Sequence, residues 1–325
     1  MNSGPPRYQS FTGRIFCDLE EAEKADFKAS SPHAIEKLND EDLLLRFAEL
    51  ADSMWIFGPN LEVTRFLVRD LPIWKSGVQC ISEIKRRHLD SETVFLSLDA
   101  HIGIGRKSIK SMMGGRRLPR AGTDKPVKFI KKQHLEDFIN KGIVQFSPAT
   151  RFQDKSLTIA QQDNEIEYSS YINPAGVTIS TLDEPEKKIP IIDSTNLKIS
   201  RKIGTNYYLF STTYGPDPRH FLDFNAEACV FIENPVQFIR RIRAAIEAQS
   251  LEWECIPWFF KVGYFDKYEA SKYAMASMAK DIKYWYQFET RLILLPPIGK
   301  PSKELEPLLL SIGSLVDITS TFQTI

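Results

Sequence analysis

The sequence predicts an α+β protein in which a helical N-terminal region precedes a region of alternating strands and helices. In the N-terminal part, apolar side chains recur at three- and four-residue spacing, which is the period of an amphipathic helix. After Pro126, short runs rich in aromatic and β-branched residues are separated by helical patterns, which is typical of strands that alternate with helices. We therefore expect a mainly helical region over residues 1–120 that ends in a basic linker, and an α+β domain over residues 125–325.

The clearest N-terminal helix begins after Asn39, where acidic residues precede an apolar repeat that runs from Leu43 to Met54. Acidic side chains favour a helix start because they face the positive end of the helix dipole. Further elements are predicted as helices over 61–68 and 78–88 and as a short strand over 93–96. Residues 101–126 are rich in glycine and basic side chains, so we expect an exposed loop or linker there.

In the C-terminal region, a helix is predicted over 133–141, and Gly142 is expected to end it. A second helix begins at Pro235, because proline is favoured in the first turn, and a third is predicted over 268–284. The polar stretch 148–196 gives no clear pattern. Strands are predicted over 127–131, 143–147, 207–213, 228–232, 256–265, 286–295 and 315–321.

The composition is that of a soluble globular protein, with 42% hydrophobic and 26% charged residues and no net charge. No apolar stretch approaches the ~20 residues of a membrane span, and the N-terminus lacks the basic start and apolar core of a secretory signal. The cysteines are far apart and show no paired ligand spacing. Asp163, Glu165 and Glu167 could bind a divalent cation, but we interpret them as a solvated acidic face. We therefore expect a cytoplasmic protein with reduced thiols, no membrane partner and no metal.

Basic side chains are concentrated between residues 105 and 132, where Asp124 is the single acid. Arg116, Arg117 and Arg120 lie at the centre of this segment. Clustered lysine and arginine bind nucleic acid because they release counterions from its phosphates. The three arginines are therefore candidate nucleic-acid contacts, and a solvated basic loop is an equally good interpretation of the segment.

The most informative residues lie near the C-terminus, in the aromatic and aliphatic run over 286–295. Gln287, Glu289 and Arg291 are set into this run at alternate positions. Successive side chains of a strand point to opposite faces, so we expect these three on one face and the intervening apolar residues in the core. A core strand with such a polar stripe usually borders a cleft.

An earlier predicted strand ends in Ser211-Thr212-Thr213, and this motif together with Gln287-x-Glu289 resembles the core motifs of the ADP-ribosyltransferases. The elements also follow one another in that family's order: strand, helix and strand, then the Ser-Thr-Thr strand, then the Gln-x-Glu strand. The resemblance covers about residue 126 to the C-terminus. It implies a split β-sheet core, with NAD as the donor substrate.

The resemblance implies that Glu289 is the catalytic carboxylate. Transfer from NAD breaks the bond between ribose and nicotinamide through an oxocarbenium-like transition state, which a carboxylate stabilises more than it stabilises the neutral sugar. Gln287 is implied to hold the acceptor, because an amide suits an amide or nucleobase edge better than a guanidinium group. In these families Gln-x-Glu accompanies modification of asparagine or guanine, and Glu-x-Glu accompanies modification of arginine.

The same resemblance implies that Ser211 braces the catalytic glutamate. Thr212 and Thr213 complete the motif, and Thr213 replaces a serine but keeps the hydroxyl. The motif's strand supports the nicotinamide pocket in the family, so an aromatic side chain from Tyr207, Tyr208 or Phe210 is expected to stack there.

The family carries an arginine or histidine on its first strand to hold the dinucleotide, and residues 127–131 contain neither. Lys128 or Lys131 could contact phosphate as a point charge, without the bidentate geometry of arginine. The nearby Arg151 is a third candidate for this contact.

The sequence therefore favours an NAD-dependent ADP-ribosyltransferase similar to bacterial toxins of toxin–antitoxin and phage-defence systems. Nucleic acid, with RNA preferred, is the expected acceptor, and an antitoxin protein is a further expected partner. Three alternatives remain open: modification of a protein target, a non-catalytic nucleic-acid- or protein-binding module on the same fold, and a nucleic-acid-binding protein whose functional surface is the basic segment.

Overall fold

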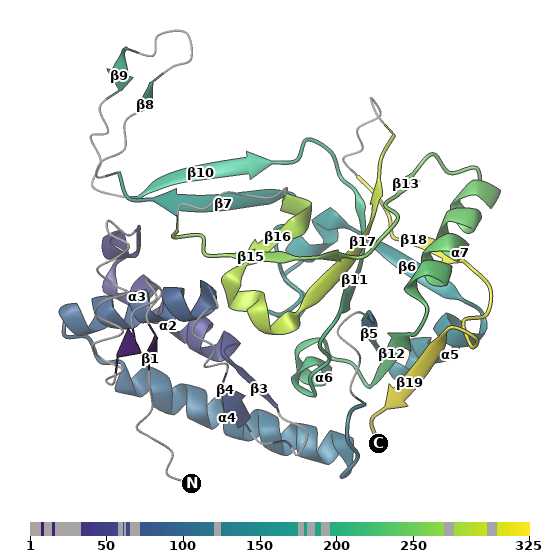
Figure 1. Ribbon diagram of the computed structural model, residues 1–325, viewed down its shortest axis with the longest axis horizontal. Coiled ribbons are helices and arrows are strands. Elements are labelled where there is room, and N and C mark those ends of the chain that lie inside the picture. The colour runs from purple at the N-terminus through teal and green to yellow at the C-terminus, as the bar shows by residue number, and fades with distance from the viewer. Residues whose placement is uncertain are drawn as a thin grey trace.

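The computed structural model of the chain (Figure 1) describes residues 8–9, 15–16, 34–57, 61, 63–65, 72–119, 125–174, 179–180, 186–189, 196–269, 276–297 and 304–325. These residues form helices and a large antiparallel sheet, so the predicted α+β class is confirmed. Figure 1 shows helices α2 to α4 at the left and lower side of the sheet, and α5 and α7 at its right.

Side-chain caps fix the start of two helices. The Asn39 side chain accepts a hydrogen bond from the backbone N–H of Asp42 at 2.8 Å, and Asn234 accepts one from that of Gln237 at 3.0 Å. The α-helices of the described chain are α2 (Asp40–Ser53), α3 (Pro72–Arg86), α4 (Glu92–Met113), α5 (Lys132–Asn140), α6 (Arg219–Asp223) and α7 (Pro235–Ala248). The 3₁₀ helices are η1 (Ala34–Lys37), η2 (Ala149–Gln153), η3 (Ala276–Met278) and η4 (Ile282–Gln287).

The strands of the large sheet are β5 (Val127–Ile130), β6 (Ile143–Pro148), β11 (Tyr208–Thr213), β12 (Ala228–Ile232), β13 (Glu254–Cys255), β14 (Phe260–Lys261), β17 (Glu289–Leu295), β18 (Leu308–Ser311) and β19 (Thr319–Gln323). Separate two-stranded ribbons pair β1 (Tyr8–Gln9) with β2 (Ile15–Phe16), β3 (Trp55–Phe57) with β4 (Val63–Arg65), β7 (Glu167–Ile172) with β10 (Leu197–Lys202), and β8 (Ile179–Ser180) with β9 (Lys188–Ile189). The ribbon of β15 (Gly263–Phe265) and β16 (Ala279–Asp281) is parallel.

The large sheet forks at β11. One edge of β11 pairs with β17 along its whole length, and Thr213 at its end lies opposite Glu289. The other edge pairs with β6 at Tyr208 and Leu209, but with β5 only at Thr213. One branch of the sheet therefore continues through β5, β12 and β19, while the other continues through β6 and β18.

Helices α5 and α7 cover one face of the forked sheet. Phe210 of β11 and Leu292 of β17 pack there in a hydrophobic cluster with Phe138 of α5 and Phe238 of α7. The opposite face of β11 and β17 carries the polar residues, because side chains alternate along a strand. The fork and this polar face together determine where a site can form.

The N-terminal helices share hydrophobic clusters with the rest of the chain. Leu50 of α2 is buried in one cluster with Tyr264 and Ile282. Ile109 of α4 is buried in another with Phe221 of α6. The N-terminal region therefore packs directly on elements that lie more than 100 residues later in the sequence.

The helices predicted after Asn39 and over 78–88 are confirmed as α2 and α3, although α3 already begins at Pro72. Two other N-terminal predictions are wrong. Residues 93–96 lie in α4 and do not form a strand. In the segment 61–68, Val63–Arg65 form strand β4, and most of the remaining residues lie outside the described part.

The loop predicted over 101–126 is wrong as far as Met113, because α4 continues to that residue. Each glycine costs a helix about 1 kcal/mol relative to alanine, which made a helix here an unfavourable prediction. Burial of Ile102 and Ile109 offsets this cost. A Cβ atom on Gly105 would lie 3.7 Å from Leu222, which is an ordinary contact distance, so the packing of α4 against α6 does not require glycine there.

Most of the predicted C-terminal elements are confirmed, as strands β5, β6, β11 and β12 and as helices α5 and α7. Gly142 follows α5 with a φ of 63°, as expected of a glycine that ends a helix. The strand predicted over 256–265 is broken into β14 and β15, and the terminal strand begins at Thr319.

The helix predicted over 268–284 is wrong for the described residues, which form η3, β16 and the start of η4. Helical propensity is a weak preference that tertiary contacts override. In this segment, β16 pairs with β15, and Lys280 and Asp281 have charged partners inside the protein.

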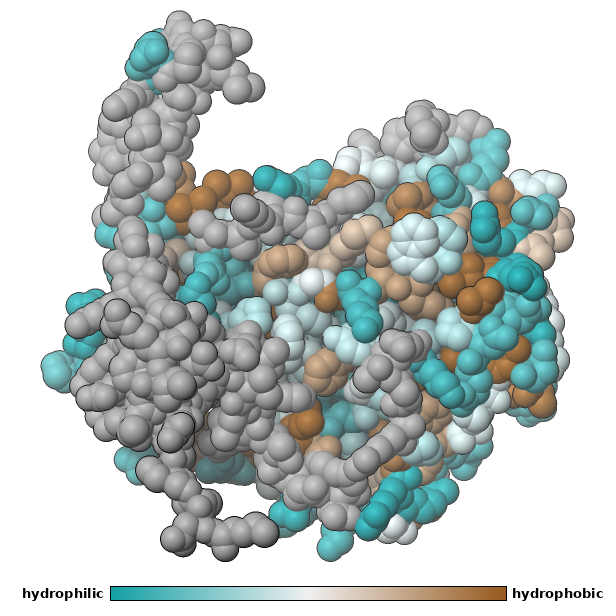
Figure 2. Space-filling model, viewed as in Figure 1, coloured by the Kyte–Doolittle hydropathy of each residue, from teal (hydrophilic) through white to brown (hydrophobic). Residues whose placement is uncertain are grey.

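Among the described residues, no helix is both long enough and apolar enough to cross a membrane. Figure 2 shows that hydrophobic residues lie in small separate groups among hydrophilic ones on the described part of the visible face. That face therefore offers no broad apolar surface within the residues that the structure describes.

Candidate active site

A cavity of about 280 Å³ opens where the two branches of the sheet leave β11. Residues of β5, β6, β11 and β17 form much of its wall. The charged side chains that line it are Lys128, Arg151, Glu165, Lys280 and Glu289. Ser211, Thr212, Thr213 and Gln287 line it too, so the fold brings both motifs of the sequence to one cavity.

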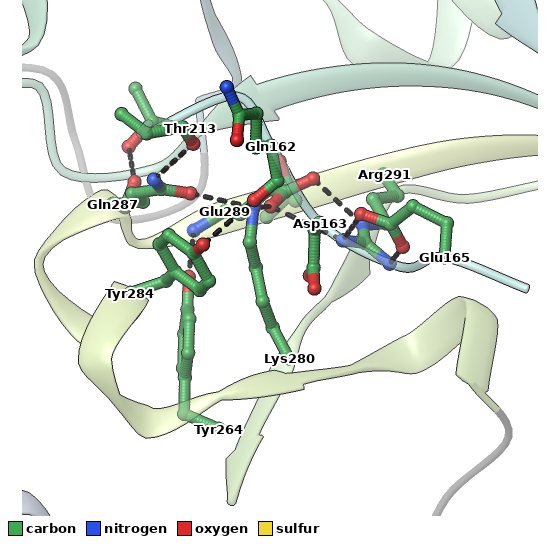
Figure 3. A network of polar contacts seen from close by, with 12 residues as sticks. Gln162, Asp163, Glu165, Thr213, Tyr264, Lys280, Tyr284, Gln287, Glu289 and Arg291 are labelled. Carbon is green, nitrogen blue, oxygen red and sulfur yellow. Dashed lines mark hydrogen bonds and ion pairs between the residues drawn. The ribbon is translucent and has the colours of Figure 1, made fainter. Parts of the chain in front are cut away.

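Glu289 is the first residue of β17, and only 6% of it is exposed. Ser211, on the neighbouring strand, helps to keep the pKa of the Glu289 carboxyl low. Nε of Arg291 donates to Oε1 at 2.7 Å, and Nζ of Lys280 donates to Oε2 at 3.1 Å, as Figure 3 shows. Each oxygen of the Glu289 carboxylate therefore has a cationic partner.

Arg291 is completely buried and is shared between two carboxylates. Its Nη1 and Nη2 atoms lie 2.6 Å from Oε2 and Oε1 of Glu165. Its Nη1 also donates to the backbone oxygen of Ser277 at 2.9 Å. Figure 3 shows that Glu165 and Glu289 approach Arg291 from different sides. The predicted position of Arg291 on the same strand face as Glu289 is confirmed.

The surroundings keep Glu289 ionised. Burial alone raises the pKa of its carboxyl, but Arg291 and Lys280 outweigh burial, and the pKa lies well below its usual range. For Glu165, burial outweighs the attraction of Arg291, and the pKa of the carboxyl is raised. Of the two, Glu165 takes up a proton first as the pH falls, and Glu289 keeps its charge.

The amide of Gln287 is hydrogen-bonded within the chain at both ends. Its Oε1 accepts from Nζ of Lys280 at 2.9 Å, and its Nε2 donates to the backbone oxygen of Ala160 at 2.7 Å. The implied role of Gln287 in holding the acceptor stays a prediction, and a bound acceptor would have to replace one of these partners.

The predicted strand position of Gln287 is wrong, because this residue ends η4 and β17 begins two residues later. Phe288 has a φ of 45° in the left-handed region and turns the chain between the two elements. Thr213 stabilises this turn, since its hydroxyl donates to the backbone oxygen of Gln287 at 2.7 Å. The Gln-x-Glu residues are thus neighbours across a turn instead of along one strand.

Lys280 is a site residue that its sequence context does not reveal. It lies in β16 with 5% exposed, and its Nζ sits between Oε1 of Gln287 and Oε2 of Glu289. Tyr264 of β15 lies opposite Lys280 in the parallel ribbon, and its hydroxyl accepts the backbone N–H of Glu289 at 2.8 Å. The apolar spacing over 268–284 predicts a helix, so Lys280 is not expected on a strand beside Glu289.

Two further cations border the cavity. Nζ of Lys128 donates to the backbone oxygen of Ser211 at 2.8 Å and lies 4.7 Å from the centre of the Phe210 ring. Burial lowers the pKa of Lys128 to about 8. Arg151 is exposed in η2. Lys131 is exposed just before α5 and does not line the cavity, so Lys128 and Arg151 are the predicted phosphate contacts that the fold brings to it.

The structure corrects the placement of Tyr208 and Phe210. Both side chains lie in the core beneath α5 and α7 and do not line the cavity. Tyr207 is buried, and its hydroxyl donates to the backbone oxygen of Glu165 at 2.7 Å. The aromatic residues that line the cavity are Phe129, Phe152 and Phe224, which lie outside both motifs.

The predicted solvated acidic face is wrong for Glu165, whereas the side chain of Glu167 is 28% exposed. Glu165 is 2% exposed and Asp163 is half-buried. Figure 3 shows Asp163 beside the pair formed by Lys280 and Glu289. The sequence around Glu165 does not reveal its burial, because a buried carboxylate needs a cationic partner and Arg291 lies 126 residues later.

The basic segment lies mainly on α4 and the turn that follows it. Arg106, Lys107 and Lys110 are exposed on α4, and Arg116 and Arg117 are exposed after it. The guanidinium of Arg116 lies 5.6 Å from the centre of the Phe322 ring. Arg120 lies outside the described residues.

Within the described part of the chain, no group of three or more His, Cys, Asp or Glu side chains could hold a metal ion. Comparison with protein-family models, curated proteins and solved structures finds no match to this chain.

Proposed function

We propose that the chain is an NAD-dependent ADP-ribosyltransferase and that Glu289 is its catalytic carboxylate. The main support is that an ionised carboxylate, braced by Ser211, lies in a cavity at the fork of an antiparallel sheet. The forked sheet agrees with the split core that the sequence resemblance implies. The strand order also brings the Ser211 and Glu289 motifs onto adjacent strands.

In the proposed reaction, the C–N bond between ribose C1 and nicotinamide breaks and its electron pair leaves with nicotinamide. The ribosyl group then carries positive charge, which Glu289 stabilises more in the transition state than in NAD. A nucleophilic atom of the acceptor forms a new bond to C1 and releases its proton. Because both carboxylate oxygens are paired in the structure, the ribose must displace Lys280 or compete with it for Oε2.

Lys128 and Arg151 are proposed to hold the phosphates of the donor. Both line the same cavity as Glu289, and neither forms an ion pair with another described residue. A lysine contacts phosphate as a point charge, whereas the planar arginine can bind two phosphate oxygens at once. Their position supports a negatively charged ligand such as a dinucleotide.

Binding of NAD should weaken as the pH rises through the pKa of Lys128, which is about 8. Lys128 is positively charged below this pKa and neutral above it, so its attraction for phosphate is lost at high pH. Titration of one essential charge predicts about a tenfold rise in Kd between about pH 7 and about pH 9. Calorimetric titration with NAD measures this change. Lys128→Met should bind more weakly near neutral pH and show a flat profile, and a steep profile in that variant would contradict the assignment.

Nucleic acid is the acceptor we propose, with RNA preferred. The exposed basic residues of α4 and the following turn support it, because α4 packs against α6 and Phe224, just after α6, lines the cavity. A nucleobase would have to be single-stranded or turned out of a duplex to reach Glu289. The role as a bacterial toxin or phage-defence protein with an antitoxin partner rests on the sequence resemblance.

A second candidate is a non-catalytic module that binds a nucleotide in the same cavity. The paired carboxylate favours this candidate, because Lys280 and Arg291 occupy both oxygens of Glu289. In this alternative, the charge network stabilises the fold and the cavity binds a ligand without breaking a bond.

Incubation with NAD labelled in the adenylate moiety separates the two candidates. The protein is incubated with RNA, with DNA and with cell lysate, and both release of nicotinamide and label on each acceptor are measured. The transferase proposal expects nicotinamide release and covalent label on nucleic acid. Label on protein alone would move the acceptor to protein. Binding of NAD without nicotinamide release or label would favour the non-catalytic module.

A further inference from the structure

The parallel ribbon of β15 and β16 brings two groups to Glu289. Tyr264 and Lys280 are directly opposite each other in its register. The Tyr264 hydroxyl accepts the backbone N–H of Glu289, and Nζ of Lys280 bonds to its side chain. The start of β15 is fixed to β17, because β14 pairs with β17 and the N–H of Val262 donates to the backbone oxygen of Glu289 at 3.0 Å. A ribbon of this length has few hydrogen bonds of its own, so the position of its other end depends on further contacts.

One side chain of the N-terminal region holds the C-terminal ends of both strands of this ribbon. Arg46 of α2 is 2% exposed. Its Nη2 donates to Oδ1 of Asp266 at 2.9 Å, and its Nη1 donates to Oδ1 of Asp281 at 2.8 Å. Asp266 directly follows β15, and Asp281 is the last residue of β16. The guanidinium therefore joins the two strands at the same end.

We propose that Arg46 is a positioning residue of the candidate active site, which fixes Lys280 and Tyr264 against Glu289 through Asp281 and Asp266. The N-terminal region is then required for the geometry of the site. The effect on ligand turnover rests on the proposed function, whereas the effect on the position of Lys280 does not.

The path from Arg46 to the site is short. Asp281 adjoins Lys280, and successive side chains of a strand point in opposite directions, so Asp281 faces α2 while Lys280 faces Glu289. The same Oδ1 of Asp281 also accepts the backbone N–H of Lys283 at 3.0 Å, which starts η4. Gln287 lies at the other end of η4. A shift of Asp281 would therefore move both neighbours of Glu289.

Arginine suits this position better than lysine. Its planar fork can reach two carboxylates at once, whereas an ammonium group is a single point charge. Glu49 adds a third carboxylate, 3.3 Å from Nη1 of Arg46 and 2.6 Å from Nζ of Lys283. The buried guanidinium is thus surrounded by acidic partners from α2, from the end of β15 and from β16.

Arg87 provides a matched control. It is an arginine of the same N-terminal region with 16% of its side chain exposed, and it pairs with Glu83 at 2.7 Å and Asp40 at 3.0 Å. Its remaining hydrogen bonds go to the backbone oxygens of Leu38 and Glu36. Loss of Arg87 should therefore destabilise the N-terminal region without acting on the ribbon.

The test compares Arg46→Met, Arg46→Lys and Arg87→Met with the unchanged protein. A water-soluble amine-acylating reagent is applied under conditions in which circular dichroism shows each protein folded, and mass spectrometry measures acylation of Lys280. Breaking a buried ion pair leaves unpaired charges and should open the segment, so we expect Arg46→Met to raise acylation of Lys280 by roughly tenfold. Arg87→Met should leave it unchanged.

Arg46→Lys keeps a buried positive charge, so it provides the test if Arg46→Met does not fold. Lysine can pair with only one aspartate at a time, so acylation of Lys280 should lie between that of the unchanged protein and that of Arg46→Met. If the variants that fold protect Lys280 as well as Arg87→Met does, the proposal is overturned.

Kinetics add a readout that a purely structural role would not produce. If NAD is cleaved, a shift of Tyr264 away from the backbone N–H of Glu289 should misplace the carboxylate and lower kcat by about 10- to 100-fold. KM for NAD should stay nearly unchanged, because Lys128 and Arg151 are untouched. If the unchanged protein does not cleave NAD, the transferase proposal fails, and the acylation result still decides the role of Arg46.

Discussion

Replacing Glu289 by glutamine should abolish ADP-ribosyl transfer while the protein stays folded. Glutamine keeps the shape of the side chain and one hydrogen-bond acceptor, so Ser211 and Arg291 retain a partner. It removes the negative charge that faces the ribosyl cation, and loss of one well-placed electrostatic group commonly costs ~10²–10³ in rate. Nicotinamide release and acceptor labelling both measure this loss.

The matched comparison is Glu165→Gln, which alters the other carboxyl partner of Arg291. Because burial raises the pKa of Glu165, a neutral amide resembles a form that this side chain adopts readily. We expect Glu165→Gln to retain much more activity than Glu289→Gln. Near-normal activity in Glu289→Gln, or equal losses in the two variants, would remove Glu289 from the chemistry and favour a non-catalytic module.

The sequence predicts the sheet around the cavity well because the information there is local. β5, β6, β11 and β12 are short apolar runs with strand periodicity, and the structure has each of them where it is expected. Local periodicity also predicts the strand that ends in the Ser211 motif and the strand that carries Glu289. Their adjacency follows from the resemblance to the family, in which the serine braces the catalytic glutamate. The alternation of β17 also places Arg291 on the same face as Glu289.

The residues that lie beside this sheet at the cavity, such as Lys280 and Glu165, could not be predicted, because long-range contacts determine their positions. Lys280 lies in a segment with helical spacing, but it is a strand residue because β16 pairs with β15. Arg46 also holds this segment through Asp281, which lies 235 residues later in the sequence. Glu165 lies in a polar stretch without clear periodicity, and its partner Arg291 is 126 residues later. The turn at Phe288 likewise depends on Thr213, which belongs to another strand.

These long-range contacts also determine which cavity residues are free to bind a ligand. Lys128 and Arg151 have no ion-pair partner among the described residues, so a negatively charged ligand can bind them without breaking an existing pair. Glu289 and Lys280 are paired with each other, so a ligand that uses Glu289 must compete with Lys280. Binding of phosphate and approach to the carboxylate are therefore separable steps.

Arg291→Met should cause the largest loss of stability among the changes considered. The guanidinium is 0% exposed and bridges Glu165 and Glu289, so its removal leaves two buried carboxylates without their shared cation. Breaking a buried ion pair from one side costs about 3–5 kcal/mol. Urea unfolding monitored by tryptophan fluorescence measures the change in the free energy of unfolding.

Arg241→Met is the matched surface control. Arg241 pairs with Asp317, whose side chain is 60% exposed, and exposed pairs contribute only about 0–1 kcal/mol. The two variants remove the same chemical group, so their difference compares a buried arginine that bridges two carboxylates with a partly exposed one that has a single carboxylate partner. Equal losses of stability would contradict the structural role assigned to Arg291.

The stability lost in Arg291→Met should depend on pH, and the direction of this dependence tests whether charge is the cause. In the unchanged protein, the pKa of Glu289 is lowered in the folded state, so its stabilising contribution persists above its unfolded pKa and is lost only as the pH falls through the folded one. Burial already raises the pKa of Glu165 in the unchanged protein, so both proteins gain stability as that carboxyl takes up a proton. Without Arg291, only Lys280 opposes the burial of Glu289, so the pKa of Glu289 rises and protonation of this carboxyl destabilises the folded variant less than the unchanged protein. The difference in unfolding free energy between the unchanged protein and Arg291→Met should therefore become smaller as the pH falls from about 7 to about 5. A gap that stays constant over this range would mean that Arg291 stabilises the fold mainly by packing, and that the charge on Glu289 does not depend on it.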